Sequence, residues 1–245
     1  MTSLDKEIDA NHERFFADWT AEASKNWASL KTHRAFKESY RRLSCLGALK
    51  RDLVVPNISQ ESAAFFHEAH NDALTSHVLA GAGAWRASLQ SMRSCIENAL
   101  CCLFYAEHPV ELRQWATGDF RIGFSALLKY FERHPDLADV PPNQSGLSQL
   151  EEEYATLSMA VHGSAVNFRM TDAAAEVLLW KDDPARAGKW GARERKVLEG
   201  ISLLLAYRFR SHLQGTSLPH VRNMLAYNIS KAQQKSLKSL ARVNI

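Results

Sequence analysis

The residues in this sequence best suited to chemistry are Ser158 and His162, four positions apart near the end of the segment 147–163. On an α-helix, a hydroxyl and an imidazole at i and i+4 share one face and can meet. Gly163 permits the helix to end there, which leaves His162 in the last turn, where the helix dipole favours a protonated imidazole. Because histidine titrates near neutral pH, His162 is the natural candidate for a general acid or base.

A second polar pair, Arg93 and Glu97, follows one edge of a long amphipathic pattern over 84–107. These two side chains can bridge each other at i,i+4 within one helix. Alternatively they face Ser158 and His162, which gathers a guanidinium, a carboxylate, a hydroxyl and an imidazole in one pocket. In RNA cleavage such a histidine transfers the proton of the attacking 2′-hydroxyl or of the leaving oxygen, and an arginine stabilises the phosphorane. The structural alternative is a satisfied polar patch where two helices cross.

The helix that positions Ser158 and His162 shows the clearest pattern in the chain. Its apolar stripe recurs at spacings of three and four residues, which is typical of a helix buried on one side; the stripe consists of Leu147, Leu150, Tyr154, Leu157 and Val161. Similar patterns predict helices over 1–52 (one long or two shorter), 59–80 with Ser59 as cap, 84–107, 120–131, 192–213 and 217–243. The sequence therefore predicts an all-α, multi-helix bundle.

The chain departs from this helical pattern after Gly163. The segments 166–170 and 176–180 are short enough for a β-hairpin, and 181–191 has the composition of a loop. We expect an N-terminal helical extension at 1–55 and a helical bundle at 56–245, with the hairpin and loop as an excursion at 164–191. The extension carries an aromatic stripe that we expect to pack on its own bundle, in preference to a partner or dimer interface: Leu4, Ile8, Phe15, Trp19, Ala23, Trp27 and Leu30.

Basic charge is concentrated at the C-terminal end. The net charge is +3, yet the segment 200–245 contains seven Lys or Arg residues and no Asp or Glu. Such a block can neutralise phosphates, dock on an acidic partner, or form a solvated face. The residues predicted to contact nucleic acid are Lys231, Lys235, Lys238 and Arg242 on the last helix, with Arg208 and Arg210 before it. A second basic run lies between Lys25 and Arg51.

Several classes of enzyme lack their signatures here. The sequence has no phosphate-binding glycine loop, no GxSxG motif and no metal-ligand cluster of recognised spacing, so we expect no cofactor and no metal. Three histidines, His67, His70 and His77, lie near Glu68 and Asp72 and suggest a metal-binding bundle. Surface histidines beside carboxylates are the interpretation we favour.

Cysteine usage and hydropathy indicate the compartment. The four cysteines show no paired CxxC spacing and suit packed thiols in a reducing environment. The first 16 residues carry charges where a signal peptide needs an apolar core, and no segment approaches the ~18 apolar residues of a membrane span. We expect a cytoplasmic protein with no membrane contact.

The motif LSMAVHGS at 157–164, preceded on an earlier helix by RSCIEN at 93–98, resembles the HEPN-like helical domains of toxin-antitoxin and anti-phage defence systems. It is also similar to uncharacterised bacterial proteins with the pattern EYxxLSxxVHGS. The resemblance covers about 84–164 and implies a dimeric, metal-independent ribonuclease. His162 matches the family's histidine, and Glu97 or Asn98 its polar residue.

This sequence differs from the HEPN pattern in one respect. The family places an arginine four to six residues before the histidine, whereas none of Ala155, Thr156, Leu157 and Ser158 is an arginine. A cation must therefore come from Arg93 or Arg86 on another helix. The leading hypothesis is an RNA-handling protein of a bacterial defence or toxin-antitoxin system, possessing a metal-independent endoribonuclease site of His162, Arg93, Glu97 and Ser158. The rival hypothesis is a non-enzymatic assembly subunit that binds a partner protein or a second copy of itself.

Overall fold

The computed structural model describes residues 2–162, 183–215 and 217–245, with the backbone alone at His162. Within these residues there is no strand, and the predicted all-α, multi-helix architecture is confirmed. The helices are α1 Ser3–Leu30, α2 Arg34–Leu49, α3 Gln60–Gly81, α4 Trp85–Glu107, α5 Pro109–Thr117, α6 Phe124–Glu132, α7 Pro142–Ser145, α8 Leu147–His162, α9 Pro184–Arg208, α10 Arg210–Leu213, α11 Pro219–Asn228 and α12 Lys231–Ser236. The predicted hairpin at 166–180 lies outside the described residues.

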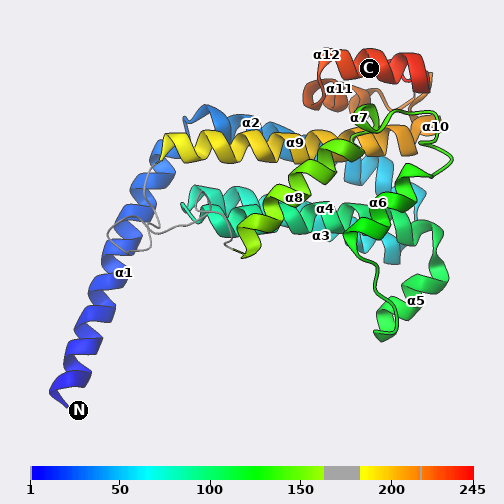
Figure 1. Ribbon diagram of the computed structural model, residues 1–245. Helices are drawn as coiled ribbons and strands as arrows, with labels where there is room; N and C mark the ends of the chain where they lie inside the picture. Colours follow the sequence, from blue (N-terminus) through cyan, green and yellow to red (C-terminus); the bar gives the residue numbers. More distant parts are fainter. Residues whose placement is uncertain (1, 163–182, 216) are drawn as a thin grey trace.

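The bundle consists of two helix pairs joined by a crossing helix (Figure 1). Helix α3 packs along α4, and α2 packs along α9, while α8 runs obliquely across and contacts both α4 and α9. The short helices α5, α6 and α10 to α12 lie at the end of the bundle away from α1. This arrangement places the middle of α4 directly against the C-terminal half of α8.

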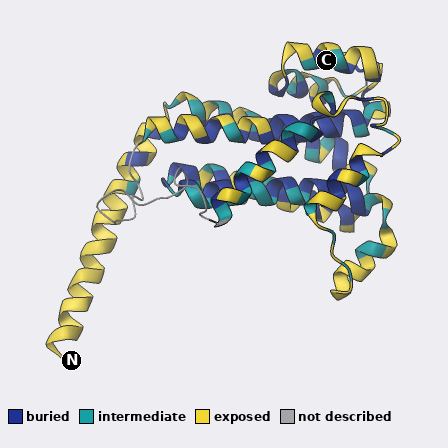
Figure 2. Cartoon of the chain, in the orientation of Figure 1, coloured by how far each residue is buried: buried dark blue, intermediate teal, exposed yellow. Residues whose placement is uncertain are grey.

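The core lies where these helices face one another, and Figure 2 shows its buried residues on the inner sides of α2, α3, α4 and α9. Its largest fully buried side chains include Tyr105, Tyr207, Phe66 and Phe131. All four cysteines are free, as predicted. Burial raises the pKa of the Cys45 thiol to about 12, so this thiol stays protonated and acts as a small apolar group.

Helix α1 does not pack as the sequence suggested. It leaves the bundle as a single projecting helix (Figure 1), and Leu4 and Phe15 are 62% and 61% exposed. Only Asn26 and Leu30, near its C-terminal end, are buried. The expectation that the aromatic stripe packs on its own bundle is therefore wrong for the first two-thirds of the helix. Amphipathic periodicity indicates that a face is apolar and not which surface covers it.

Helix α2, in contrast, belongs to the bundle. Its buried residues include Phe36, Leu43, Cys45 and Leu46, and it packs on α9 and α11. The predicted extension at 1–55 therefore divides at 31–33, where His33 caps α2 by accepting a hydrogen bond from the amide of Ala35. Only α1 projects.

Two predicted boundaries also change. The loop predicted over 181–191 is helical from Pro184, because Asp183 accepts a hydrogen bond from the Arg186 amide at 2.9 Å and proline suits the first helical position. The predicted single helix 217–243 is interrupted after Asn228: Ser230 begins α12 with a capping box to Gln233. The Ser59 cap of α3 is confirmed. None of the described helices has the length and apolar character needed to cross a membrane.

Candidate functional site

The polar edges of α4 and α8 meet at the crossing of these helices. Nε of Arg93 on α4 donates to Oγ of Ser158 on α8 at 3.1 Å, and the Ser158 hydroxyl donates to the Tyr154 carbonyl oxygen at 2.8 Å. Glu97, one turn after Arg93, forms an ion pair with it, and Nη2 of Arg93 lies 3.0 Å from Oε1 of Glu97. These contacts bring Arg93, Glu97 and Ser158 into one cluster. The sequence alone did not decide whether the two polar edges meet.

Tyr154 completes this cluster, and the sequence analysis assigned it only to the apolar stripe. Its hydroxyl donates to Oε1 of Glu97 at 2.6 Å and accepts from Nη2 of Arg93. Its ring stacks on Phe124 of α6 with centroids 3.6 Å apart, and the Arg93 guanidinium lies 4.6 Å from its centroid. Burial and the Glu97 hydrogen bond raise the pKa of Tyr154 to about 12, so its hydroxyl remains protonated at neutral pH.

Arg86 fixes the end of α8 from the same face of α4. Its Nε donates to the carbonyl oxygen of Ala160, and its Nη2 to that of Val161, each at 2.8 Å. These carbonyls belong to the last turn of a helix, where they lack partners within the helix and carry the negative end of the dipole. Arg86 therefore holds the turn that contains His162. The side chain of His162 lies outside the described residues.

One hydrogen-bond donor of this cluster is not used within it. Nη1 of Arg93 has no hydrogen-bond partner among the described residues, and the Arg93 and Glu97 side chains are both partly exposed. A guanidinium held by its Nε and Nη2 atoms, with Nη1 free, is oriented to donate to an anion that approaches from solvent. The same contacts also join α4 to α8, so the cluster has structural value in either case.

The cations predicted to contact nucleic acid separate into two groups. Lys231, Lys235, Lys238 and Arg242 are exposed around α12. Arg208 and Arg210 instead turn toward Asp136, and Arg208 also pairs with Glu107. Since their charge is already neutralised, we do not include these two arginines in the proposed binding surface.

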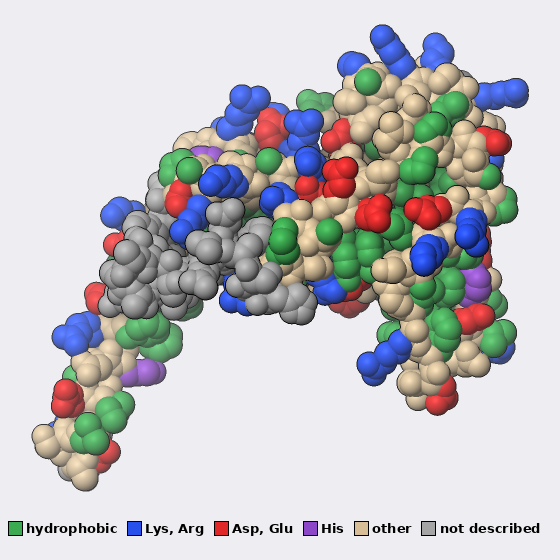
Figure 3. Space-filling model, in the orientation of Figure 1, with side chains coloured by type: hydrophobic (Ala, Val, Ile, Leu, Met, Phe, Trp, Pro, Cys, Tyr) green, Lys and Arg blue, Asp and Glu red, His purple; other side chains and the backbone are tan. Residues whose placement is uncertain are grey.

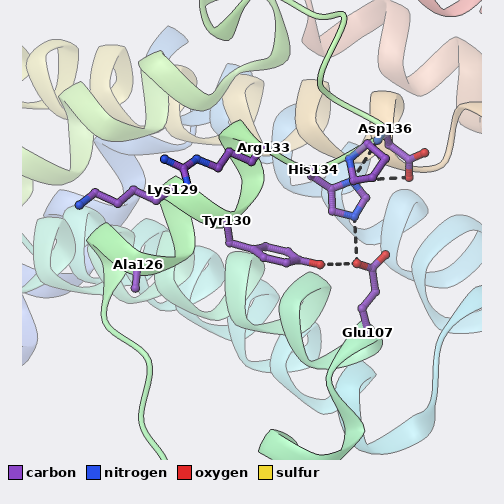
Figure 4. A pocket seen from close by; sticks show the side chains of 8 residues that line it. Glu107, Ala126, Lys129, Tyr130, Arg133, His134 and Asp136 are labelled. Carbon is purple, nitrogen blue, oxygen red and sulfur yellow. Dashed lines mark hydrogen bonds and ion pairs between the residues drawn. The ribbon is translucent and has the colours of Figure 1, made fainter.

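Glu107 and Asp136 belong to a second polar cluster, which the sequence analysis missed (Figure 4). Nδ1 of His134 accepts from the Asp136 amide at 3.1 Å, so the ring proton is on Nε2 and is donated to Glu107 at 2.9 Å. Burial lowers the pKa of His134. Both ring nitrogens of His134 have hydrogen-bond partners, so we assign this cluster a structural role, although it borders a cavity of about 600 Å³.

The histidines proposed for a metal are engaged separately. Nδ1 of His70 lies 3.0 Å from Nζ of Lys50, and Nδ1 of His77 lies 2.8 Å from Oγ of Ser39. Among the residues that the structure describes, no three His, Cys, Asp or Glu side chains come together to hold a metal ion.

A buried ion pair lies beneath α2. Glu194 of α9 is fully buried and accepts from Nε and Nη2 of Arg42, each at 2.6 Å, and from the Ser39 hydroxyl at 3.0 Å. Burial raises the pKa of the Glu194 carboxyl, and Arg42 and Ser39 oppose that shift. Its spacing of three and four residues with Trp190, Val197 and Ile201 places Glu194 on the buried face of α9, a signal that the sequence analysis did not use.

Comparisons with models of protein families, with curated proteins and with solved structures gave no match for this chain.

Proposed function

We propose that this protein is a HEPN-like, RNA-handling protein of a bacterial defence or toxin-antitoxin system, with a metal-independent endoribonuclease site where α4 crosses α8. The observation that carries the proposal is the contact between Arg93 and Ser158, which lies one turn before His162 on α8. Arg93 thereby supplies from α4 the cation that the segment before His162 lacks. The exposed residues Lys231, Lys235, Lys238 and Arg242 add a phosphate-binding surface.

The proposed reaction is a transesterification within RNA. The 2′-oxygen attacks the adjacent phosphorus and loses its proton, and the 5′-oxygen of the next nucleotide leaves and gains one. The products are a 2′,3′-cyclic phosphate and a 5′-hydroxyl. His162 transfers one of these protons and solvent water the other, while Nη1 of Arg93 donates to the phosphorane oxygens. Tyr154, Ser158 and Glu97 position the guanidinium, because they bind its other nitrogens.

The test is cleavage of total RNA and tRNA in EDTA by the wild type and by His162→Ala. We expect the wild type to produce fragments that end in a cyclic phosphate, and we expect the variant to produce none. Cleavage by neither protein, or equal cleavage by both, would remove the catalytic proposal. His67→Ala on α3 is the matched control, because it makes the same substitution at an exposed histidine outside the cluster.

A second candidate function is assembly through α1, and the exposure of its apolar face favours it. Ile8, Phe15 and Phe16 are 56%, 61% and 47% exposed on a helix that projects from the bundle. We propose that a second copy of this chain covers this face. Helix α1 carries three basic and six acidic residues, so the rest of the chain has a net charge of +6, and an acidic apolar arm complements a basic body.

Light scattering at several concentrations tests this assembly. We expect the wild type to form a dimer, and Ile8→Asp with Phe15→Asp to form a monomer with unchanged helical content, because the charges cannot be buried in an interface. A monomeric wild type, or a dimer that the two substitutions leave intact, would contradict the role of α1.

A further inference from the structure

The outer face of α2 carries a second set of cations that the proposed function does not use. Lys31, in the turn before α2, and Arg34, Lys37 and Arg41, on the helix itself, recur at spacings of three and four, and all four are exposed. Among the described residues, the first three have no carboxylate partner, and Arg41 pairs only with the exposed Glu38. Because exposed ion pairs are weak, Arg41 can exchange this partner for a phosphate.

Two clefts flank this basic face. One, of about 540 Å³, lies between α1, α2 and α3 and is lined by Leu30, Phe36, Tyr40 and His77 together with Lys31 and Lys37. The other, of about 300 Å³, lies between α2, α9 and the end of α11, with Arg34, Arg195 and Tyr227 among its lining residues. Figure 3 shows Lys and Arg side chains along the corresponding upper edge of the molecule.

Each cleft has an exposed tyrosine in its wall. Tyr40 is 67% exposed and Tyr227 is 73% exposed, and neither ring stacks on another aromatic ring among the described residues. Proteins bind single-stranded nucleic acid with cations placed along its phosphates and with exposed aromatic rings on which its bases stack. A duplex does not suit these clefts, because its bases are stacked inside and cannot reach a tyrosine.

The first cleft also offers a hydrogen-bond acceptor. The Ser39 hydroxyl donates its one proton to Glu194, so at the 2.8 Å contact between Ser39 and His77 the imidazole is the donor through Nδ1. Nε2 of His77 is then an acceptor with no partner among the described residues. Base amino groups and the 2′-hydroxyl of RNA are suitable donors for it.

The second cleft leads toward the other basic surface. Its far wall is formed by Asn228, Ile229 and Ser230, and Lys231 follows directly as the first residue of α12. Exposed cations thus lie on both sides of this cleft, on α2 and on α12. Arg42 does not contribute, because its guanidinium is directed inward to Glu194.

We propose that the outer face of α2 and its two flanking clefts form a binding track for single-stranded RNA, with phosphates on Lys31, Arg34 and Lys37 and bases stacked on Tyr40 and Tyr227. The choice of RNA rests on the proposed function. The track itself rests on the charges, clefts and exposed rings of α2 and its neighbours.

The test is fluorescence anisotropy with a labelled single-stranded oligoribonucleotide of about 12 nucleotides, using full-length protein with His162→Ala so that the probe stays intact. Two variants address the track: the triple variant Lys31→Gln, Arg34→Gln, Lys37→Gln, and the double variant Tyr40→Ala, Tyr227→Ala. The triple variant Arg121→Gln, Lys129→Gln, Arg133→Gln changes the same charge on exposed residues around α6. Circular dichroism verifies that all variants are folded.

We expect the α2 charge variant to bind at least about tenfold more weakly and to lower the slope of log affinity against log salt by about 2. The tyrosine variant should also lose about tenfold in affinity, with an unchanged salt slope because stacking releases no counterions. The α6 variant should bind within about twofold of the parent protein, because its three substituted residues lie outside the track and contact no phosphate of the bound strand.

Three results would overturn the track: equal binding by the α2 and α6 charge variants, tighter binding of duplex RNA than of the single strand, or tighter binding of an acidic peptide than of the single strand. Failure of the proposed function is distinguishable. Wild-type cleavage that depends on His162, with binding indifferent to α2, removes the track alone. Binding that depends on α2, without cleavage by the wild type, removes the ribonuclease alone.

Discussion

Nε of Arg93 donates to Oγ of Ser158 at 3.1 Å, which ties the middle of α4 to the last turns of α8. Ser158→Ala removes this acceptor and the hydroxyl that returns to the Tyr154 carbonyl. We expect a loss of stability of about 1 kcal/mol and a fall in kcat for RNA of about tenfold, with little change in KM, because the guanidinium loses orientation. Urea unfolding and initial rates measure the two effects. A normal kcat with the stability loss would leave Ser158 a structural role only.

The start of α8 depends on a close approach between two glycines. Gly146 has a φ of +89°, and a Cβ there would lie 2.4 Å from the Gly200 carbonyl oxygen of α9. Gly146→Ala should therefore lower the free energy of unfolding by about 2 kcal/mol or more. Gly188→Ala is the matched control, because nothing lies within 4 Å of its Cβ position; it should stabilise α9 by about 0.5 kcal/mol. Equal effects in thermal unfolding would contradict this packing.

The buried ion pair of Arg42 and Glu194 differs from the exposed pair of Arg41 and Glu38 one residue away. Glu194→Ala leaves a buried guanidinium without its partner and should cost about 3–5 kcal/mol. Glu38→Ala should cost less than about 1 kcal/mol, since both partners are hydrated. Urea titration of both variants measures the difference, and a cost below that of Glu38→Ala would show that Glu194 does not hold α9 to α2.

Stability should fall as the solution is acidified from neutral pH. Burial lowers the pKa of His70, His77 and His134 below the ordinary value of 6.5. Below pH 6.5 these three histidines therefore bind more protons in the unfolded chain than in the folded chain, so their contribution to the free energy of unfolding decreases as pH falls through that range. The measurement is urea unfolding at pH 7.5 and at pH 5.5. A stability that rises on acidification would contradict histidines that stay neutral in the folded protein.

His77→Gln isolates one contribution, because its amide can still donate to Ser39. The groups that face His77 are the Ser39 hydroxyl and Phe36 from α2, Trp190 from α9, and the Arg42 charge that also lowers its pKa. The variant should lose less stability than the wild type between the two pH values. An unchanged difference would mean that His77 does not titrate in this window.

The sequence predicted where the helices lie along the chain, but not which helices pack against one another. Apolar periodicity located α3, α4 and α8 because each buries one continuous stripe, and it placed Arg93 and Ser158 on polar edges. It did not show that these edges meet, since contact between helices depends on crossing angles that one-dimensional spacing does not encode. For the same reason, the exposed face of α1 looked like a buried one.

The sequence also did not predict the hydrogen bonds and ion pairs between polar side chains that are far apart along the chain. The Glu194 contacts with Arg42 and Ser39 join α9 to α2, more than 150 positions away. Tyr154 joined the cluster through its hydroxyl and its ring, although the apolar stripe predicted only burial for it. The sequence suggested that Arg208 is a free cation, because its carboxylate partners, Glu107 and Asp136, lie on other elements.

The most direct test of the ribonuclease proposal is a double-mutant cycle between Arg93 and His162. Initial rates of RNA cleavage in EDTA would be measured for Arg93→Ala, His162→Ala and the double variant, with thermal unfolding to verify that each is folded. If both side chains act on one phosphodiester, each single substitution lowers kcat/KM by about 100-fold or more, and the double variant is no slower than the slower single variant. Losses that multiply, or a wild type that cleaves no RNA, would contradict a shared catalytic site.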